Sequence, residues 1–159
     1  MHWLIDGHNL IGQMPTIRLD EANDEVKLLE YLSRYRARTG HAMTVFFDAG
    51  QAYRPAKKRK HGGVVVRFAP HGKTADHLIM HRLGKVKNPQ AIGVVTSDRA
   101  VQQAARFAQV RVVSSQEFAQ ELLNLAAQVA EESRAEIELS EDEIEAWLEI
   151  FNNEQSKKD

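Results

Sequence analysis

WLIDGHN, residues 3–9, is a short apolar run that ends at an acid, a glycine and two polar residues. Its length and composition predict a buried β-strand over His2–Ile5, followed by a loop. Further apolar runs rich in Val, Ile and Phe repeat this pattern along the chain: Met43–Phe47, Val64–Phe68, Ala91–Val95 and Val110–Val113. Near-continuous apolar strands of this kind are typical of a parallel sheet that is covered on both faces.

Helical patterns separate most of these strands. Apolar residues recur at helical spacing over Leu19–Arg38, His77–Leu83 and Arg99–Ala108. Strands that alternate with helices predict an α/β fold: a three-layer sandwich with a mostly parallel sheet of about five strands. The segment Ala49–Gly63 has no helical period and contains several glycines and a proline, which is typical of a functional loop.

The end of the chain has a different character. Ser114 with Glu117, and Ser140 with Glu143, match the spacing of a capping box, which predicts two helices, Ser115–Ala135 and Glu141–Asn152. The second helix carries an apolar stripe on an acidic background. We expect this stripe to pack on the domain, and docking of a partner protein is the alternative. The predicted organisation is a domain over residues 1–135 and an acidic C-terminal helix and tail over residues 136–159.

Charge is divided unevenly along the 159 residues, whose net charge is only -1. Residues 1–116 contain 18 Lys and Arg against 9 Asp and Glu, whereas residues 117–159 contain 3 against 13. This asymmetry predicts a body that binds a polyanion and an acidic appendage. The absence of cysteine excludes a disulfide framework, thiolate zinc sites and cysteine nucleophiles. No apolar run matches a membrane helix and no signal-peptide pattern is present, so we expect no membrane partner and a cytoplasmic location.

Aspartates stand where the predicted strands end. Asp6, Asp48 and Asp98 follow three of the strands, and Asp76 opens the helix after a fourth. Ligands of open α/β sheets bind at the carboxyl ends of the strands. Carboxylates gathered there would repel one another unless a cation lies between them, and their hard oxygen ligands favour Mg²⁺ or Mn²⁺. For each aspartate taken singly, a helix cap or turn is the alternative role.

Four short motifs resemble a known family. They are DGHNLI at residues 6–11, FFD at 46–48, TADHLI at 74–79 and VTSDR at 95–99. Together they resemble the NYN domains of the PIN-like nuclease superfamily, and among these the YacP-type branch, which includes a ribosome-associated endoribonuclease. The resemblance covers about residues 2–125.

The resemblance implies a PIN-like, Rossmannoid sheet and divalent-metal-dependent cleavage of RNA. It implies catalytic and metal-ligating roles for Asp6, Asp76 and Asp98, with Asp48 as a further acid at the metal. Asn9 would orient a water or a phosphate. It also implies that the substrate is single-stranded RNA or mRNA, engaged on the ribosome.

Residues 51–75 contain seven basic residues and no acid. Lys and Arg bind the phosphate backbone of nucleic acids without reading its sequence. We therefore predict that RNA is bound by basic residues of this window and by Arg99, which follows the candidate ligand Asp98. The predicted RNA-binding residues are Arg54, Lys57, Lys58, Arg59, Lys60, Lys73 and Arg99. A solvated surface loop is the alternative.

These observations predict an endoribonuclease that depends on Mg²⁺ or Mn²⁺ and hydrolyses RNA phosphodiesters. No Gly-rich phosphate-binding motif is present, so we expect no nucleotide cofactor. The alternative is a non-catalytic RNA- or ribosome-binding module with a PIN-like fold, whose RNA binding would not respond to metal.

Overall fold

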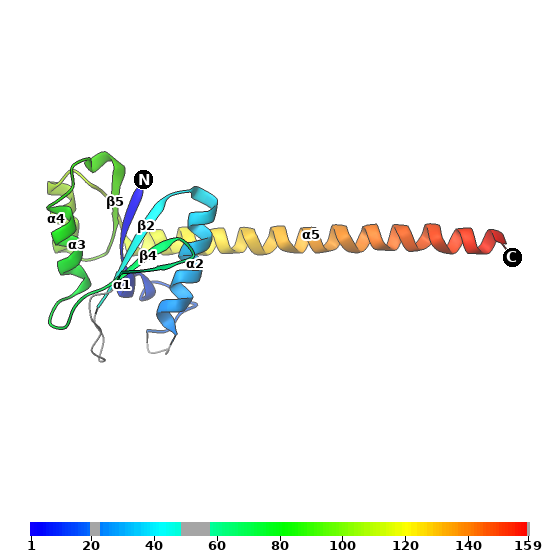
Figure 1. Ribbon diagram of the computed structural model, residues 1–159, viewed down its shortest axis with the longest axis horizontal. Coiled ribbons are helices and arrows are strands. Elements are labelled where there is room, and N and C mark those ends of the chain that lie inside the picture. Colours follow the sequence, from blue (N-terminus) through cyan, green and yellow to red (C-terminus); the bar gives the residue numbers. More distant parts are fainter. Residues whose placement is uncertain (20–22, 49–57, 159) are drawn as a thin grey trace. The chain divides into compact units, whose positions relative to one another are not determined.

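The computed structural model describes residues 1–19, 23–48 and 58–158 (Figure 1). Its strands are β1 (His2–Asp6), β2 (Ala42–Phe47), β3 (Lys58–His61), β4 (Val64–Phe68), β5 (Ile92–Val95) and β6 (Arg111–Val113). Its α-helices are α1 (Gly7–Ile11), α2 (Asp24–Thr39), α3 (Ala75–Leu83), α4 (Arg99–Phe107) and α5 (Ser115–Lys158), and a 3-10 helix, η1, covers Pro89–Ala91. None of these helices is long and apolar enough to cross a membrane.

The strands form one sheet in the order β3-β4-β2-β1-β5-β6. All neighbouring pairs are parallel except β3 and β4, which are antiparallel. The predicted α/β class and mostly parallel sheet are therefore confirmed. The prediction missed β3, because its sequence is Lys-Arg-Lys-His and carries no apolar pattern. Part of the segment expected to be a loop is thus an edge strand.

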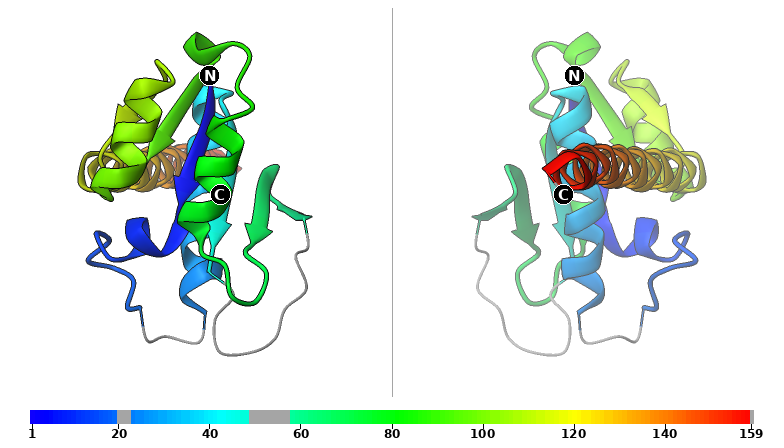
Figure 2. Two further views of the ribbon diagram at one scale, coloured as in Figure 1. Left: turned by 90° about the vertical axis from the view of Figure 1, so that its left-hand side faces the viewer. Right: turned by 90° about the vertical axis from the view of Figure 1, so that its right-hand side faces the viewer.

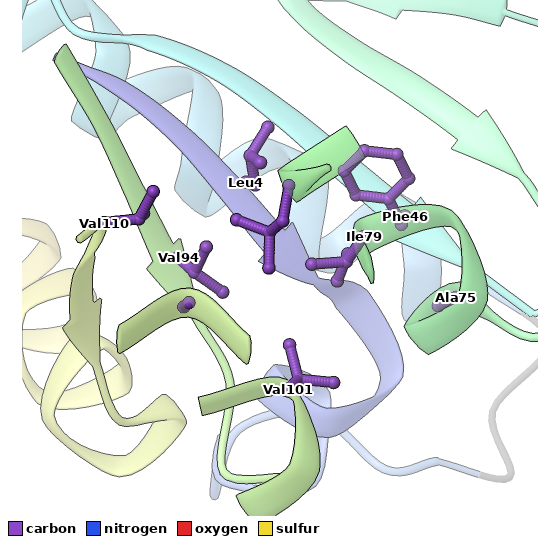
Figure 3. Close-up of a cluster of buried hydrophobic side chains, with 9 residues drawn as sticks. Leu4, Phe46, Ala75, Ile79, Val94, Val101 and Val110 are labelled. Carbon is purple, nitrogen blue, oxygen red and sulfur yellow. The ribbon is translucent and has the colours of Figure 1, made fainter. Parts of the chain in front are cut away.

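Helices cover both faces of the sheet, as Figure 2 shows. Alternate residues of the strands point to opposite faces. Leu4, Phe46 and Val94 pack against α3 and α4 on one face (Figure 3). On the other face, Trp3 lies against Phe118 at the start of α5, with ring centroids 5.7 Å apart. The central strands β1, β2 and β5 are buried on both sides, which explains why their sequences are almost continuously apolar.

Two helices differ from the sequence prediction. Helix α1 begins directly after β1, in a stretch expected to be a loop. The two C-terminal helices predicted from capping boxes are one continuous helix, α5. Ser114 Oγ accepts a hydrogen bond from the Glu117 backbone N–H at 3.1 Å, so the first capping box begins α5. Ser140 lies inside α5, and the prediction of a helix start there was wrong.

The chain divides into two compact units, Met1–Leu123 and Asn124–Asp159. Most of α5 belongs to the second unit. Within this unit the side chains of the apolar stripe, Ile144, Trp147, Leu148 and Phe151, are 45–64% exposed, and their packing on the domain stays a prediction. Within the stripe, the rings of Trp147 and Phe151 stack with centroids 5.8 Å apart.

The two serines provide a matched test of the continuous helix. Replacing Ser114 by Ala removes the acceptor for an otherwise unpaired amide, and we expect the free energy of unfolding to fall by about 1 kcal/mol. Replacing Ser140 by Ala is expected to change the stability by less than about 0.5 kcal/mol, because an exposed mid-helix Ser caps nothing. Urea unfolding followed by circular dichroism measures both. Equal losses in the two variants would contradict a single helix.

Candidate active site

Asp6 ends β1 and begins α1. It is buried, and its Oδ1 accepts a hydrogen bond from the Asn9 backbone N–H at 3.4 Å, so it caps α1. The residue that follows must be Gly7, because a Cβ there would lie 2.3 Å from the ring of Phe47. Phe47 is fully buried and has no room to move away. The close contact of α1 with β2 therefore fixes the Asp6 carboxyl at the end of the sheet.

Asp76 lies in the first turn of α3, and its carboxyl is hydrogen-bonded to that of Asp6. Burial, the hydrogen bond with Asp76 and the negative charge of Asp76, in that order of size, raise the pKa of Asp6 from 3.8 to about 7. The charge of Asp48 adds to this effect, whereas the Asn9 amide opposes it. Three of the four predicted aspartates therefore act on one another at the carboxyl ends of β1 and β2.

Asp48 directly follows β2 and is held from two sides. Its Oδ1 accepts a hydrogen bond from the Ala75 backbone N–H at 2.8 Å, and its Oδ2 lies 3.6 Å from His8 Nδ1. His8 Nε2 lies 3.2 Å from Glu25 Oε1 on α2. The hydrogen bond with Glu25 raises the pKa of His8, and the charge of Asp48 contributes in the same direction. His8 thus lies between two acids, Glu25 on α2 and Asp48 after β2.

Asp98 is the N-cap of α4, and its Oδ1 accepts a hydrogen bond from the Val101 backbone N–H at 3.1 Å. It is not among the charges that act on Asp6. Asn9 connects this region to α1, because its Oδ1 accepts hydrogen bonds from the Ser97 backbone N–H and from Ser115 Oγ. In the part of the chain that the structure describes, the Asn9 side-chain nitrogen donates to no protein acceptor.

The donor set fits a hard divalent cation. Mg²⁺ is usually held by one or two carboxylates together with waters and substrate phosphates. Asp6 and Asp76 supply such a pair, with Asp48 beside them. Over residues 1–19, 23–48 and 58–158, no three His, Asp or Glu side chains form a ready-made metal cage. Carboxylate oxygens are the protein ligands that Mg²⁺ and Mn²⁺ prefer.

The predicted RNA-binding residues are only partly described. Arg54 and Lys57 lie outside the described residues, and the structure gives Lys58 and Arg59 only as backbone in β3. Lys60 on the same edge strand is exposed. Lys73 and Arg99 are also exposed. Lys73 precedes α3, which contains Asp76, and Arg99 is the first residue of α4, which Asp98 caps.

Sequence reasoning missed the residues that support the site. Glu25 contacts His8, and buried Ser115 joins Asn9 to the start of α5. An acid in the first turn of α2 is ordinary helix chemistry, so nothing in the sequence connects Glu25 with a residue 17 positions earlier. Ser115 is 106 positions from Asn9, and only the folded chain brings the two together.

Comparisons with known proteins identify the family of this chain. The family model of the YacP-like NYN domain matches residues 3–158. The uncharacterized protein YacP of Bacillus subtilis is 35% identical over 107 residues, which cover 64% of this chain and 62% of that protein. The match therefore spans less than two thirds of this curated relative.

Crystal structures of Rae1 (YacP) from Bacillus subtilis have the same fold. One is 27% identical, covers 92% of each chain and has a TM-score of 0.67. The W164L mutant is 26% identical, covers 84% of this chain and 81% of the other, and has a TM-score of 0.66. The match of the family model over nearly all residues and the shared fold agree with each other. This chain belongs to the YacP-like NYN domain family.

Proposed function

We propose that this protein is an endoribonuclease that depends on Mg²⁺ or Mn²⁺. The observation that carries the proposal is the contact between the Asp6 and Asp76 carboxyls, which burial and mutual repulsion make unfavourable when both are charged. A bound cation removes this cost, since an opposite charge favours both ionised forms. The electrostatic free energy that the two adjacent carboxylates cost would then be offset when the cation binds.

Each acid has a role in this proposal. Asp6 and Asp76 would hold the cation, with Asp48 and Asp98 as further ligands. When bound, the cation supplies positive charge at the scissile phosphate and lowers the pKa of a water. His8 fixes the Asp48 carboxylate through its Nδ1. The Asn9 side-chain nitrogen would donate to a phosphate oxygen, and hydrolysis would leave a 5′-phosphate on one product.

The surrounding cations suit an RNA substrate. Exposed Lys60, Lys73 and Arg99 lie on β3, before α3 and on α4. We place the RNA backbone along these residues, and we extend the proposal to mRNA bound on the ribosome. Family resemblance supports that extension, and cleavage of ribosome-bound mRNA compared with the same RNA in free solution tests it.

Metal dependence gives the first test. We expect cleavage of end-labelled single-stranded RNA in Mn²⁺ or Mg²⁺, products that carry a 5′-phosphate, and no cleavage in EDTA. Adding excess Mg²⁺ back should restore the rate, because the ligands are carboxylates that remain in place without the ion. Cleavage that persists in EDTA would contradict the proposal. Salt-sensitive RNA binding without any cleavage would instead indicate the non-catalytic RNA-binding module.

Asp98 requires a separate variant, because it also caps α4. Asn is as good an N-cap as Asp, so Asp98→Asn retains the helix start while it removes the charge. We expect an unchanged free energy of unfolding and a loss of cleavage of at least about 10-fold, as for residues that support a metal site. A full rate in this variant would restrict Asp98 to its capping role.

A further inference from the structure

A second cationic feature lies at the opposite end of the sheet from the acids. It is an open pocket of about 370 Å³ between the end of α3 and the start of β5. We call it the basic pocket, and it is lined by Arg82, Lys85, Val86, Lys87, Ala91 and Ile92, together with Asn88. Ile92 pairs with His2 at the start of β1, whereas Asp6 ends that strand. The two sites are therefore about 13 Å apart along β1.

The charge of the basic pocket is unbalanced. The sequence contains no Asp or Glu from residue 77 to residue 97. Within the described residues, Arg82, Lys85 and Lys87 have no carboxylate within ion-pair distance. Burial lowers the pKa of His2, and the positive charge of Arg82 lowers it further. The folded chain thus keeps three uncompensated cations around one small pocket.

Backbone hydrogen bonds order the turn that carries these cations. Lys85 N–H donates to the Arg82 carbonyl at 3.1 Å, and Val86 N–H donates to the Leu83 carbonyl at 3.3 Å. Ala91 N–H donates to the Asn88 carbonyl at 3.2 Å in the 3-10 helix η1. The turn from α3 to β5 is therefore ordered. A preformed site loses little conformational entropy when an anion binds.

The walls of the pocket indicate the kind of anion. Val86, Ala91 and Ile92 provide an apolar surface between the cations. Lys binds phosphate as a point charge, and Arg binds it through a planar pair of donors. Ligand sites of similar volume combine apolar walls with a few polar groups that fix the orientation. An inorganic anion would leave the apolar wall unused, whereas a nucleotide has both a phosphate and a base or sugar to place on it.

We propose that the basic pocket binds a nucleotide phosphate, either within an RNA chain or on a free mononucleotide. If the phosphate belongs to an RNA chain, the basic pocket would bind nucleotides that are distant from the cleavage site. This form of the inference rests on the proposed function. If the ligand is a free mononucleotide, the inference does not depend on nuclease activity. In both forms the cations contact the phosphate, and the apolar wall contacts the base or ribose.

The test measures binding in EDTA, so that cleavage plays no part. The probes are a labelled 12-nucleotide single-stranded RNA, AMP and inorganic phosphate. The variant R82Q/K85Q/K87Q is compared with R18Q/R34Q/R106Q, which loses the same charge from exposed arginines outside the pocket. We expect the pocket variant to weaken RNA binding about 10-fold at low salt and to reduce the salt slope by about 2, because each phosphate contact on a single strand contributes about 0.7.

The AMP arm separates the two sources. AMP should shift the methyl resonances of Val86, Ala91 and Ile92 in the wild type but not in the pocket variant, and inorganic phosphate should bind more weakly. RNA binding lost without any AMP effect assigns the pocket to the RNA chain. Equal RNA affinities and salt slopes in the two triple variants, together with no AMP shift at these methyls, would overturn the inference. These binding measurements do not depend on cleavage. If the metal test shows no cleavage, the proposed function fails and the binding inference can still hold.

Discussion

Asp6→Asn is expected to reduce RNA cleavage at least about 100-fold, because it removes one carboxylate of the pair that holds the cation. The variant should keep its fold, since Asn accepts the same capping hydrogen bond from the Asn9 amide. Cleavage of end-labelled single-stranded RNA in Mn²⁺ measures the loss. Glu30→Gln on the exposed side of α2 is the matched control, because it removes the same charge away from the site.

The Asp76→Asn variant extends this test to the other member of the pair. It should lose cleavage to a similar degree, and the double variant should lose little more, because residues that act as one unit are not additive. Independent losses that multiply in the double variant would contradict a shared site. A wild-type rate in either single variant would remove that residue from the proposed mechanism.

The stability of the metal-free protein is expected to fall as the pH rises from about 4 to about 7. The folded-state pKa of Asp6 is raised from 3.8 to about 7, so the folded state binds more protons than the unfolded state in this window. The stabilisation from this group is complete below pH 4 and is lost as the pH rises through 7. The full difference amounts to up to about 4 kcal/mol, because Asp6 is buried.

Urea unfolding in EDTA at pH 5 and pH 8 measures this effect. Asp6→Asn should be the more stable protein at pH 8 and should lose most of the pH dependence, whereas Glu30→Gln should follow the wild type. Adding Mg²⁺ at pH 8 should stabilise the wild type and not Asp6→Asn, because a ligand of the folded state shifts unfolding by mass action. This readout does not depend on catalysis. A wild type whose stability rises with pH in EDTA would contradict the raised pKa.

Sequence reasoning predicted the parallel sheet well, because strands buried on both faces leave a continuous apolar signal in residues such as Val45, Phe46 and Phe47. It failed where that signal is absent, at the basic strand β3, whose place in the sheet depends on pairing with β4. It also failed at Ser140. A capping box marks a possible helix start, but a strong helical sequence on both sides continues through it.

In the candidate site, too, local sequence patterns predict some features and tertiary packing decides the others. The positions of Asp6 and Asp48 after their strands follow from the apolar runs, and they predict one edge of the sheet. The bridge from Glu25 through His8 to Asp48 depends on how α2 packs beside α1, which local patterns do not encode. The different surroundings of Asp76 and Asp98 also come from tertiary packing, since both begin helices after a strand.

The two tryptophans lie in different units and in opposite environments. Trp3 is 5% exposed on β1, with the Arg111 guanidinium 5.6 Å above its ring, whereas Trp147 is 64% exposed on α5. Intrinsic fluorescence therefore contains two separable signals. The emission of Trp3 is shielded from a soluble quencher such as iodide and reports unfolding of the sheet. The emission of Trp147 is open to the quencher, so its protection gives a label-free optical record of anything that covers the C-terminal helix.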